Sequence, residues 1–378
     1  MRTFITLFLM AALSGCATIG PKNSPNERWS AAKAHAWYAK QGWLAGCNYA
    51  PATAINQLEM FQAATFDPER IDLELKWASE LGFNTMRIFL HDLLWEQDAK
   101  GFQQRLDQVL GICQKHRIKP LIVLFDSCWD PNPTLGYQHP PVPGVHNSGW
   151  VQSPGAAALT DASQYARLEA YTKGIIGAFA QDSRILGWDL WNEPDNVSGS
   201  GVYGKSEPVN KIALIEALLP KVFAWARAAK PTQPLTSGVW EHGGYDWSSP
   251  EKWNKIEQIQ LTQSDFITFH TYADSATFRR NINQLKTLGR PLICTEYLAR
   301  GNKSTFETFL PIAKAERVGM INWGFVQGKL QTELPWDSWD KPYINGHELK
   351  IWHHEILRTN GQPYRKEETD LIKRMLLN

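Results

Sequence analysis

The chain has 378 residues, and its 39 basic and 38 acidic side chains leave a formal net charge of +1. This balance gives no electrostatic footprint for nucleic acid or for an anionic membrane surface, and it indicates a neutral partner. Seventeen tryptophans supply flat apolar faces with a polar N–H edge, which suit stacking on sugar rings as well as packing in a core.

The N-terminus has the features of an export signal. A positive charge at Arg2 precedes the apolar run Phe4–Leu13, which is too short to be a membrane-spanning helix of about 20 residues. The sequence Leu-Ser-Gly-Cys that follows, over residues 13–16, resembles the bacterial lipobox. This resemblance implies cleavage before Cys16 and attachment of a lipid to that cysteine.

The same resemblance divides the chain into three parts. Residues 1–15 are the expected signal peptide, residues 16–30 a lipid-anchored tether, and residues 31–378 one folded domain. Ala17 after the cysteine is compatible with sorting to the outer membrane. We therefore expect an exported monomer that is held on a bacterial membrane only through its lipid and faces the periplasm or the cell surface.

From Trp43 onward, short apolar or β-branched runs alternate with longer segments of helical period. This alternation is typical of βαβ units with a parallel sheet, and eight repeats predict an α/β protein with a single closed (β/α)8 barrel. Near-continuous hydrophobicity, as in Leu121–Phe125, fits strands that are buried on both faces. The expected strands cover residues 44–49, 85–90, 120–126, 185–191, 234–239, 266–270, 291–295 and 319–325.

Capping signals mark several of the intervening helices. Asp-Pro-Glu at residues 67–69 places a carboxylate before a proline and predicts a helix start, and Ser-Thr-Phe-Glu at residues 304–307 predicts a capping box. Gly82 and Gly319 are expected to end these two helices. A terminal helix is expected over residues 367–377.

The connection Ser127–Asp161 is far too long to be a simple turn, and it is rich in proline and tryptophan. Because it follows the third strand, it belongs at the C-terminal face of the barrel, where barrel enzymes have their active sites. Long ordered loops are usually functional. We expect this segment to wall the site, with a structural flap as the alternative.

Two glutamates follow apolar strands at tight turns. Glu193 comes after the fourth expected strand and Glu296 after the seventh, so that both side chains converge over the same opening of the barrel. Cleavage of a glycosidic bond needs two carboxyl groups in different environments, one to protonate the leaving oxygen and one to attack carbon or activate water. Glu193 and Glu296 are therefore the predicted catalytic pair.

An ordered set of motifs on the other strands accompanies this pair. Asn192-Glu193-Pro194 follows the fourth strand, Arg87 lies on the second, His270-Thr271-Tyr272 on the sixth, Trp323 on the eighth and Gly46–Tyr49 on the first. With Glu296, this set resembles glycoside hydrolase family 5. The resemblance implies a retaining clan A O-glycosyl hydrolase of the cellulase and mannanase type, without cofactor or metal. It also implies β-linked gluco-, manno-, galacto- or xylo-configured substrates, with Glu193 as the general acid/base and Glu296 as the nucleophile.

The resemblance also gives roles to the supporting residues. Arg87 would hold Glu296 ionised, Tyr272 would donate to Glu296, His270 would contact the substrate or the acid/base, and Trp323 would offer a floor to the sugar. Taken singly, these residues fit a barrel ion pair, a core histidine or packing equally well. The full set of expected substrate contacts is Asn48, Arg87, His91, Asp126, Trp129, Asn192, Trp240, His270, Tyr272, Trp323, Gln327 and Trp336. Asn192 is expected to bind the sugar 2-hydroxyl.

The third strand departs from the family pattern. It ends with Asp126-Ser127-Cys128, where many members carry a histidine that contacts substrate, and Asp126 or His91 is expected to take over that contact. Gln327, Gln331 and Trp336 are expected either to wall the sugar site or to decorate the surface. The remaining cysteines, Cys47, Cys113, Cys128 and Cys294, are expected to be buried small hydrophobes.

Other functions remain open on the sequence alone. A non-catalytic sugar-binding lipoprotein or a transglycosylase could use the same barrel. A metal-dependent hydrolase needs more ligands at the strand ends than His91 and His270 provide. A retaining mechanism predicts carboxyl groups about 5 to 5.5 Å apart, against roughly 6.5 to 9.5 Å for inversion. The bulky loops after the third and eighth strands favour a pocket, with exo action or action on short oligosaccharides.

Overall fold

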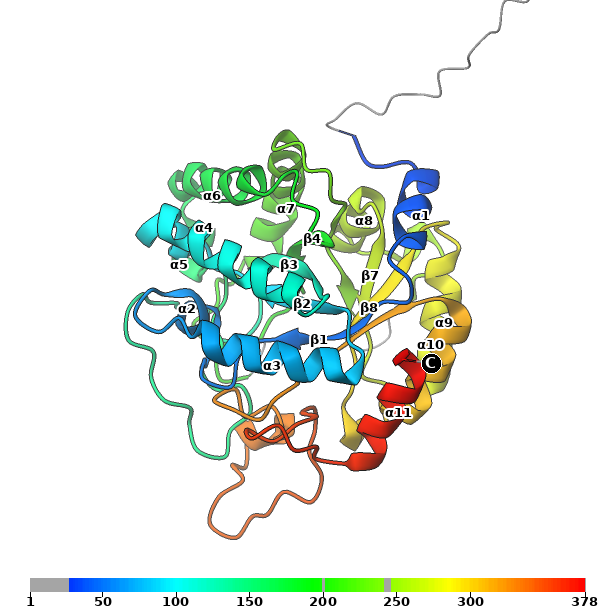
Figure 1. Cartoon of the computed structure of the whole chain (residues 1–378). Coiled ribbons are helices and arrows are strands. Elements are labelled where there is room, and N and C mark those ends of the chain that lie inside the picture. Colours follow the sequence, from blue (N-terminus) through cyan, green and yellow to red (C-terminus); the bar gives the residue numbers. More distant parts are fainter. Residues whose placement is uncertain (1–26, 199–200, 241–245, 378) are drawn as a thin grey trace, which may run out of the picture.

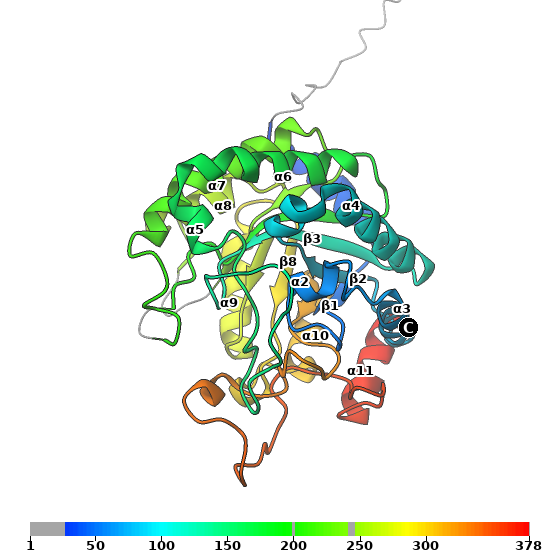
Figure 2. The same cartoon turned by 90° about the vertical axis from the view of Figure 1, so that its left-hand side faces the viewer.

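Parallel strands form the centre of the molecule, and helices surround them (Figures 1 and 2). This computed structural model describes residues 27–198, 201–240 and 246–377. The arrangement is the predicted (β/α)8 barrel. The expected signal peptide, Cys16 and most of the expected tether lie outside the described residues. Within the described ranges, no helix is long and apolar enough to cross a lipid bilayer.

All eight expected strands are present, and every pairing between neighbouring strands is parallel. The strands are β1 (Ala45–Tyr49), β2 (Thr85–Phe89), β3 (Lys119–Asp126), β4 (Gly187–Asn192), β5 (Leu235–Thr236), β6 (Val239–Trp240), β7 (Ile267–His270), β8 (Leu292–Glu296) and β9 (Gly319–Asn322). Their order in the sheet is β5-β4-β3-β2-β1-β9-β8-β7-β6.

The fifth expected strand is divided into β5 and β6, and these two halves stand at the two ends of the sheet order. β5 pairs with β4 and β6 pairs with β7, so the segment 235–240 closes the ring. Only Ser237 and Gly238 separate the halves. Gly238 lies so close to Thr268 that a Cβ atom there would come within 2.8 Å of its hydroxyl oxygen. The bulk of any other residue would push β6 away from β7.

A buried carboxylate, that of Asp265, holds the N-terminal end of this closure together. It accepts hydrogen bonds from the Arg227 guanidinium at 2.7 Å through both of its oxygens. It also accepts from the main-chain N–H groups of Leu235, at 2.8 Å, and Trp29, at 2.7 Å. Arg28 donates to the carbonyl groups of Leu261 and Ser264 nearby. Arg28 and Trp29, which were expected to belong to the tether, therefore contact the barrel.

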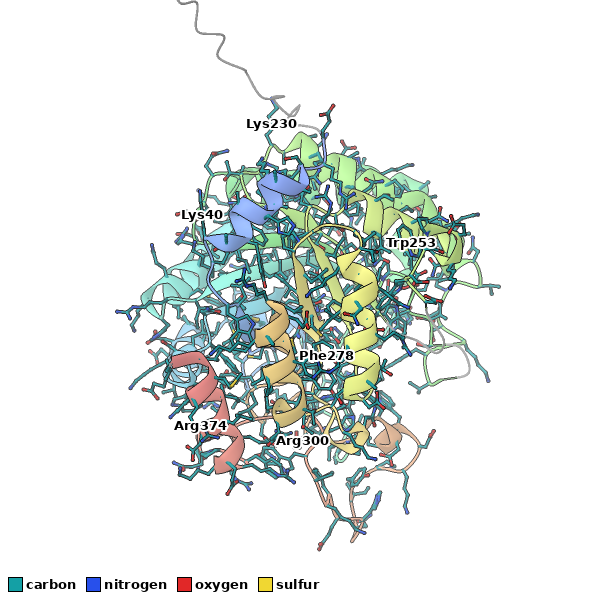
Figure 3. All side chains as sticks on the ribbon, turned by 90° about the vertical axis from the view of Figure 1, so that its right-hand side faces the viewer. Lys40, Lys230, Trp253, Phe278, Arg300 and Arg374 are labelled. Carbon is teal, nitrogen blue, oxygen red and sulfur yellow. The ribbon has the colours of Figure 1, made fainter. Side chains whose placement is uncertain are left out.

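The helical layer packs on the strands through aromatic side chains. Phe278, a residue of α9 that is labelled in Figure 3, stacks on Phe309 of α10 with ring centroids 4.4 Å apart and approaches Phe269 of β7 at 6.1 Å. The α-helices are α1 (Ala31–Ala39), α2 (Gln57–Phe61), α3 (Pro68–Leu81), α4 (Asp92–Lys115), α5 (Ala156–Thr160), α6 (Tyr165–Ala178), α7 (Lys211–Ala228), α8 (Lys255–Gln263), α9 (Ser275–Lys286), α10 (Phe306–Glu316) and α11 (Lys366–Leu377). Among the described residues there are also four short 3-10 turns, one of which is η4 (Trp336–Trp339).

The predicted helix boundaries are right for α3 and α11 but wrong for α10. Asp67 caps α3 by accepting from the N–H of Arg70, and Gly82 ends the helix with a φ of 92°. The N-cap of α10 is Thr305 and not the preceding serine. Its last turn is ended by Arg317, at a φ of 55°, while Gly319 already belongs to β9.

Replacement of Asp265 by alanine is expected to lower the free energy of unfolding by about 3 to 5 kcal/mol, because it leaves the buried Arg227 charge without its partner and two N–H groups without an acceptor. Urea unfolding followed by tryptophan fluorescence measures this change. The control is Asp107→Ala, which removes an exposed partner of Arg184 and is expected to change stability by at most about 1 kcal/mol. A similarly small change for Asp265→Ala would contradict a structural role of this carboxylate.

Candidate active site

Glu193 and Glu296 come together at the C-terminal end of the barrel. Glu193 directly follows β4, and Glu296 is the last residue of β8. Both line a cavity of about 890 Å³, where they are 7% and 6% exposed. The nearest oxygens of the two carboxyl groups lie within 4.8 Å of each other. This short separation agrees with the spacing of about 5 to 5.5 Å in retaining glycosidases and leaves no room for the water of an inverting one.

The backbone at Glu193 is strained, with a φ of 41°. Residues other than glycine rarely adopt this left-handed conformation, and such strain is concentrated at functional sites. The following turn is held by a hydrogen bond of 2.9 Å from the N–H of Asn196 to the carbonyl of Glu193.

Arg87 on β2 is the centre of the polar network under the cavity. It is fully buried, and its donors reach Asp189 at 2.8 and 3.0 Å, Glu296 at 2.9 Å, Asn48 at 3.0 Å and Asn192 at 2.7 Å. Burial alone would lower the pKa of Arg87, but Asp189 and Glu296 raise it above its ordinary value. The guanidinium therefore stays charged and fixes the nucleophile.

Tyr272 is the second group that fixes Glu296. Its hydroxyl donates to the other carboxylate oxygen at 2.7 Å. Burial, together with Glu296, raises the pKa of Tyr272 well above its usual value, so the hydroxyl keeps its proton and acts only as a donor. Arg87 thus holds one carboxylate oxygen of Glu296, and the Tyr272 hydroxyl holds the other.

The environment of Glu193 contains only neutral donors. Its Oε1 lies 2.7 Å from Nδ1 of His270, and its Oε2 accepts from the amide of Asn196 at 2.7 Å and from the thiol of Cys128 at 3.3 Å. Burial lowers the pKa of His270 to about 4, so this ring is neutral at neutral pH. His270 therefore contacts the expected acid/base, one of its two predicted partners.

The two carboxyl groups differ in their preference for a proton. Burial raises the pKa of both Glu193 and Glu296. Arg87 and Tyr272 oppose this effect at Glu296 through direct contacts, whereas no cation touches Glu193 among the described residues. The direct contacts of Arg87 and Tyr272 favour the ionised form of Glu296, and Glu193, which lacks such a cation, is the better placed of the two to carry a proton. This is the difference that an acid and a nucleophile require.

Cys128 differs from the sequence-based expectation. It is half-buried and lines the cavity, instead of being enclosed in the core. Burial, followed by the charges of Glu193 and Asp126, raises the pKa of Cys128 well above its ordinary value. The group therefore remains a thiol that donates to Glu193. The other cysteines resolved in the barrel, Cys47, Cys113 and Cys294, are buried as expected.

Asp126 is the last residue of β3, at the strand end where the sequence departs from the expected family pattern. Its oxygens accept from the Asn192 amide at 2.9 Å, from the Trp150 indole at 2.6 Å and from the main-chain N–H of Cys128 at 3.0 Å. Because Arg87 holds the oxygen of Asn192 and Asp126 holds its nitrogen, the orientation of this amide is fixed. Asp126 also lines the cavity.

Seven of the predicted contact residues line the cavity: Asp126, Trp129, Asn192, Trp240, Tyr272, Trp323 and Trp336. The other five, Asn48, Arg87, His91, His270 and Gln327, do not. Arg87 and His270 bond to residues that do line it, and Asn48 accepts a hydrogen bond from Arg87.

The predictions that His91 and Gln327 contact substrate are wrong, because neither residue lines the cavity. His91 is fully buried at the start of α4, where its ring accepts from the N–H of Leu93 and lies 3.0 Å from the carbonyl of Gln152. Both ring nitrogens are thus engaged. Gln327 donates to Glu333 at 3.0 Å, away from the cavity. Gln331 likewise serves the loop structure, by donating to main-chain carbonyls of the segment Ser127–Asp161.

Several residues of the site escaped the sequence analysis. Asp189 is fully buried in β4, and a charge inside an otherwise apolar strand was a signal that a buried cation lies opposite. Asn196 is three residues beyond Glu193 on the same turn. Trp339 lies in the loop after β9 that was expected to wall the pocket, whereas Tyr203 comes from the loop after β4, whose position no local pattern predicts; both line the cavity.

The predicted wall of the site is formed by two loops together. The segment Ser127–Asp161 and the segment after β9 lie side by side at the lower end of the molecule in Figures 1 and 2. The N–H of Asn147 donates to the carbonyl of Leu330 at 2.8 Å, and the N–H of Tyr343 donates to Gly144 at 2.9 Å. This mutual bonding closes one side of the cavity.

Glu193, His270 and Glu296 each offer an atom that could bind a metal ion, and these atoms lie within 4.8 Å of one another. Arg87 already lies 2.9 Å from Glu296 and opposes the binding of a second cation there. The arrangement is better suited to proton transfer and nucleophilic attack.

Comparisons with known proteins agree with this geometry. A family model described as cellulase (glycosyl hydrolase family 5) matches residues 75–341. A probable mannan endo-1,4-beta-mannosidase F of Aspergillus flavus is 25% identical over 229 residues, which cover 55% of this chain and 44% of that protein. Mannan endo-1,4-beta-mannosidase A of Aspergillus aculeatus is 24% identical over 220 residues, with coverages of 54% and 53%. The chain thus spans about half the length of the curated relatives it matches.

Solved structures share the fold at lower identity. A beta-1,4-mannanase from the sea hare Aplysia kurodai is 17% identical, with a TM-score of 0.54 over 74% of this chain and 87% of that one. An exo-beta-1,4-mannosidase from Opitutaceae bacterium strain TAV5 is 18% identical, with a TM-score of 0.57 over 88% of this chain and 60% of that one.

Replacement of Asn196 by alanine removes a hydrogen bond that lowers the pKa of Glu193, so that pKa is expected to rise. An acid that protonates the leaving group stays active up to its pKa, and the alkaline limb of kcat/KM for glycoside cleavage is therefore expected to move to higher pH. Asn210→Ala, at an exposed position before α7, is the control and should leave the limb in place. An unshifted limb in Asn196→Ala would contradict the assignment.

Proposed function

The chain belongs to glycosyl hydrolase family 5, and on that premise we propose that it hydrolyses β-linked saccharides with retention of configuration. The observation that carries the proposal is the pair Glu193 and Glu296, within 4.8 Å of each other, with the Arg87 guanidinium bonded to Glu296 and only neutral donors bonded to Glu193. A barrel that merely bound sugar would have no need for this difference.

The reaction proceeds by double displacement. A carboxylate oxygen of Glu296 attacks the anomeric carbon while Glu193 gives its proton to the glycosidic oxygen, so that the bond to the leaving group breaks and a glycosyl ester forms. Glu193, now ionised, takes a proton from water as that water attacks the same carbon. The ester bond breaks, Glu296 regains its charge, and two inversions at carbon give net retention.

The lining of the cavity favours a neutral sugar. Its ionisable side chains include Asp126, Glu193, Glu296 and Asp340, and none of the described residues that line it is a lysine or an arginine. A uronic acid or a phosphorylated sugar would meet repulsion from these carboxylates without a cation to offset it. The aromatic rings of Trp323 and Trp336 supply apolar faces for the ring of such a sugar.

We assign a β-mannosidic substrate, because the curated relatives are named as mannan endo-1,4-beta-mannosidases. The wall built by the two hydrogen-bonded loops favours release of sugars from chain ends, or action on short oligosaccharides, over cleavage within a long polymer. An open groove would instead favour cleavage within a long polymer.

The N-terminal sequence supports an exported, lipid-anchored enzyme. The lipobox-like residues 13–16 precede the barrel, and α1 lies at the opposite side of the molecule from the loops of the cavity in Figures 1 and 2. An anchor on Cys16 would therefore leave the cavity facing away from the membrane, with outer-membrane sorting through Ala17.

Replacement of Glu296 by alanine is expected to reduce turnover of β-1,4-mannooligosaccharides by about 10⁴-fold or more, because no nucleophile remains to form the ester. Binding, measured by calorimetry, should persist. Azide should restore cleavage of an activated β-mannoside and give the α-azide, since it attacks without the second inversion. The control, Glu251→Ala, alters an exposed glutamate that does not line the cavity and should retain full activity. Undiminished turnover in Glu296→Ala would disprove the mechanism.

Replacement of Cys16 by serine is expected to release the protein from the membrane fraction and to abolish its labelling by radioactive palmitate, because serine cannot carry the thioether lipid. Cell fractionation and labelling of the full chain measure both effects. Cys113→Ser, which alters a buried thiol of α4, should keep the label. A Cys16→Ser protein that remains labelled would contradict the anchor.

A further inference from the structure

A second hollow in the surface lies at the end of the barrel opposite to the catalytic cavity. It has a volume of about 820 Å³ and is bordered by α1 and by the C-terminal ends of α9 and α10. Leu292, the first residue of β8, lines this hollow, whereas Glu296, the last residue of the same strand, lines the cavity. Figure 3 shows Lys40, at the end of α1, toward one end of the molecule and Arg300, after β8, toward the other. We call the hollow the basic groove, after the four cations that line it: Lys286, Arg290, Lys314 and Arg317.

The charge of the basic groove is opposite to that of the catalytic cavity. Besides its four cations the groove has one carboxylate, that of Glu316, which is paired with Lys286. The cavity has four carboxylates, and none of the described residues that line it is a lysine or an arginine. The net charge of +1 therefore hides a positive groove and a negative cavity at opposite ends of the barrel. A local excess of one charge attracts the opposite charge even when the whole chain is nearly neutral.

Arg290 is half-buried, whereas the other three cations of the groove are exposed. Its guanidinium donates to the main-chain carbonyls of Asp265, at 2.7 Å, and Trp29, at 2.9 Å. In the part of the chain that the structure describes, no carboxylate pairs with it. Burial lowers the pKa of Arg290 and outweighs the attraction of the Asp265 charge. An anion in the groove would supply the negative charge that this guanidinium lacks.

Two aromatic rings lie beside the exposed cations. The ammonium group of Lys314 is 5.4 Å from the centre of the Trp43 ring, and the indole of Trp43 donates to the carbonyl of Val318 at 2.8 Å. The hydroxyl of Tyr38 donates to the carbonyl of Arg317 at 3.1 Å. Both rings are thus held at the groove by main-chain acceptors. Tryptophan and tyrosine rings next to lysine and arginine side chains are typical of surfaces that meet the polar interface of a membrane.

The N-terminal segment enters the barrel beside the basic groove, since Arg290 bonds to Trp29. Ten residues, 17–26, separate Cys16 from Glu27, the first described residue. A chain of that length spans at most about 40 Å. A lipid on Cys16 would therefore keep the groove close to the membrane surface.

We propose that the basic groove binds the phosphate headgroup of an anionic membrane phospholipid, and that this contact orients the barrel with its catalytic cavity away from the membrane. The inference rests on the proposed lipid anchor, which brings the groove to the membrane, and not on the hydrolase activity. Each basic residue close to an anionic membrane surface strengthens binding by about fivefold. Four cations give a contact that is weak alone and lasting when a lipid acts with it, so loss of the anchor still releases the protein.

The test places the lipidated full chain in vesicles of phosphatidylcholine, with or without about 25% phosphatidylglycerol, and measures how fast an amine-reactive reagent in the water labels each lysine. Mass spectrometry reads the labelled positions. We expect Lys286 and Lys314 to be labelled about fivefold or more slowly in the anionic vesicles than in the neutral ones, because the headgroup covers them. Lys205 and Lys341, which are exposed in the loops after β4 and β9, should be labelled at the same rate in both.

Arg317→Gln removes one cation of the groove and should weaken the contact about fivefold, so that the labelling of Lys286 and Lys314 returns toward the rate in neutral vesicles. Lys205→Gln, which removes the same charge at the cavity end, is the matched control and should leave their protection unchanged. Thermal unfolding of both variants reports whether the fold is intact.

Three results would overturn the inference. The first is equal protection of all four lysines, or of none, in the anionic vesicles. The second is an equal effect of Arg317→Gln and Lys205→Gln. The third is the same protection of Lys286 and Lys314 by inorganic phosphate without vesicles, which would assign the groove to a free anion. If the purified protein carries no lipid on Cys16, the proposed anchor fails and the inference fails with it, whereas the hydrolase function is unaffected.

Discussion

The buried guanidinium of Arg87 constrains the rest of the site. A charge without solvent contact is tolerated only when acceptors meet its donors and opposite charges offset it. The neighbouring strands therefore have to present Asn48, Asp189, Asn192 and Glu296 in fixed directions. The Arg87 cation offsets the buried negative charges at the centre of the barrel. It also positions the nucleophile Glu296 and Asn192, the residue beside the acid. Loss of this one charge would leave two buried carboxylates without compensation, so folding and chemistry depend on it together.

This arrangement also explains how one glutamate can serve as acid and then as base. While Glu296 is ionised, its negative charge favours a proton on Glu193. In the proposed reaction, formation of the glycosyl ester removes that charge, and the pKa of Glu193 falls as a result. Asn196 and Cys128 continue to donate to Glu193, and they stabilise the ionised form that must accept a proton from water. Neutral donors suit this role because they do not bind the carboxylate so tightly that it cannot be protonated again.

The sequence predicted correctly those elements that are marked by a pattern of neighbouring residues. Apolar runs located the strands, and Glu193 and Glu296 stood at strand ends, where parallel topology alone brings side chains together. The errors concern residues whose neighbours come from distant segments. His91 follows β2, as a substrate contact would, but its ring caps α4 and is covered by the loop around Gln152. Cys128 looked like a core residue because the sequence does not reveal which way a side chain points where β3 ends.

The chemistry and the specificity of this barrel rest on different kinds of structure. The reacting groups sit on strands held by the barrel, whereas the cavity walls come from loops that bond to each other, as Asn147 does to Leu330. Substitutions in these loops can therefore change which sugar binds without disturbing the hydrogen bonds of Arg87. The turn η4 is the exception, because its Trp339 stacks on Trp129 while its Trp336 meets Tyr272 edge-on. A shift of that turn would disturb Tyr272, which donates to Glu296, so this part of the wall is less free to vary than the loops around it.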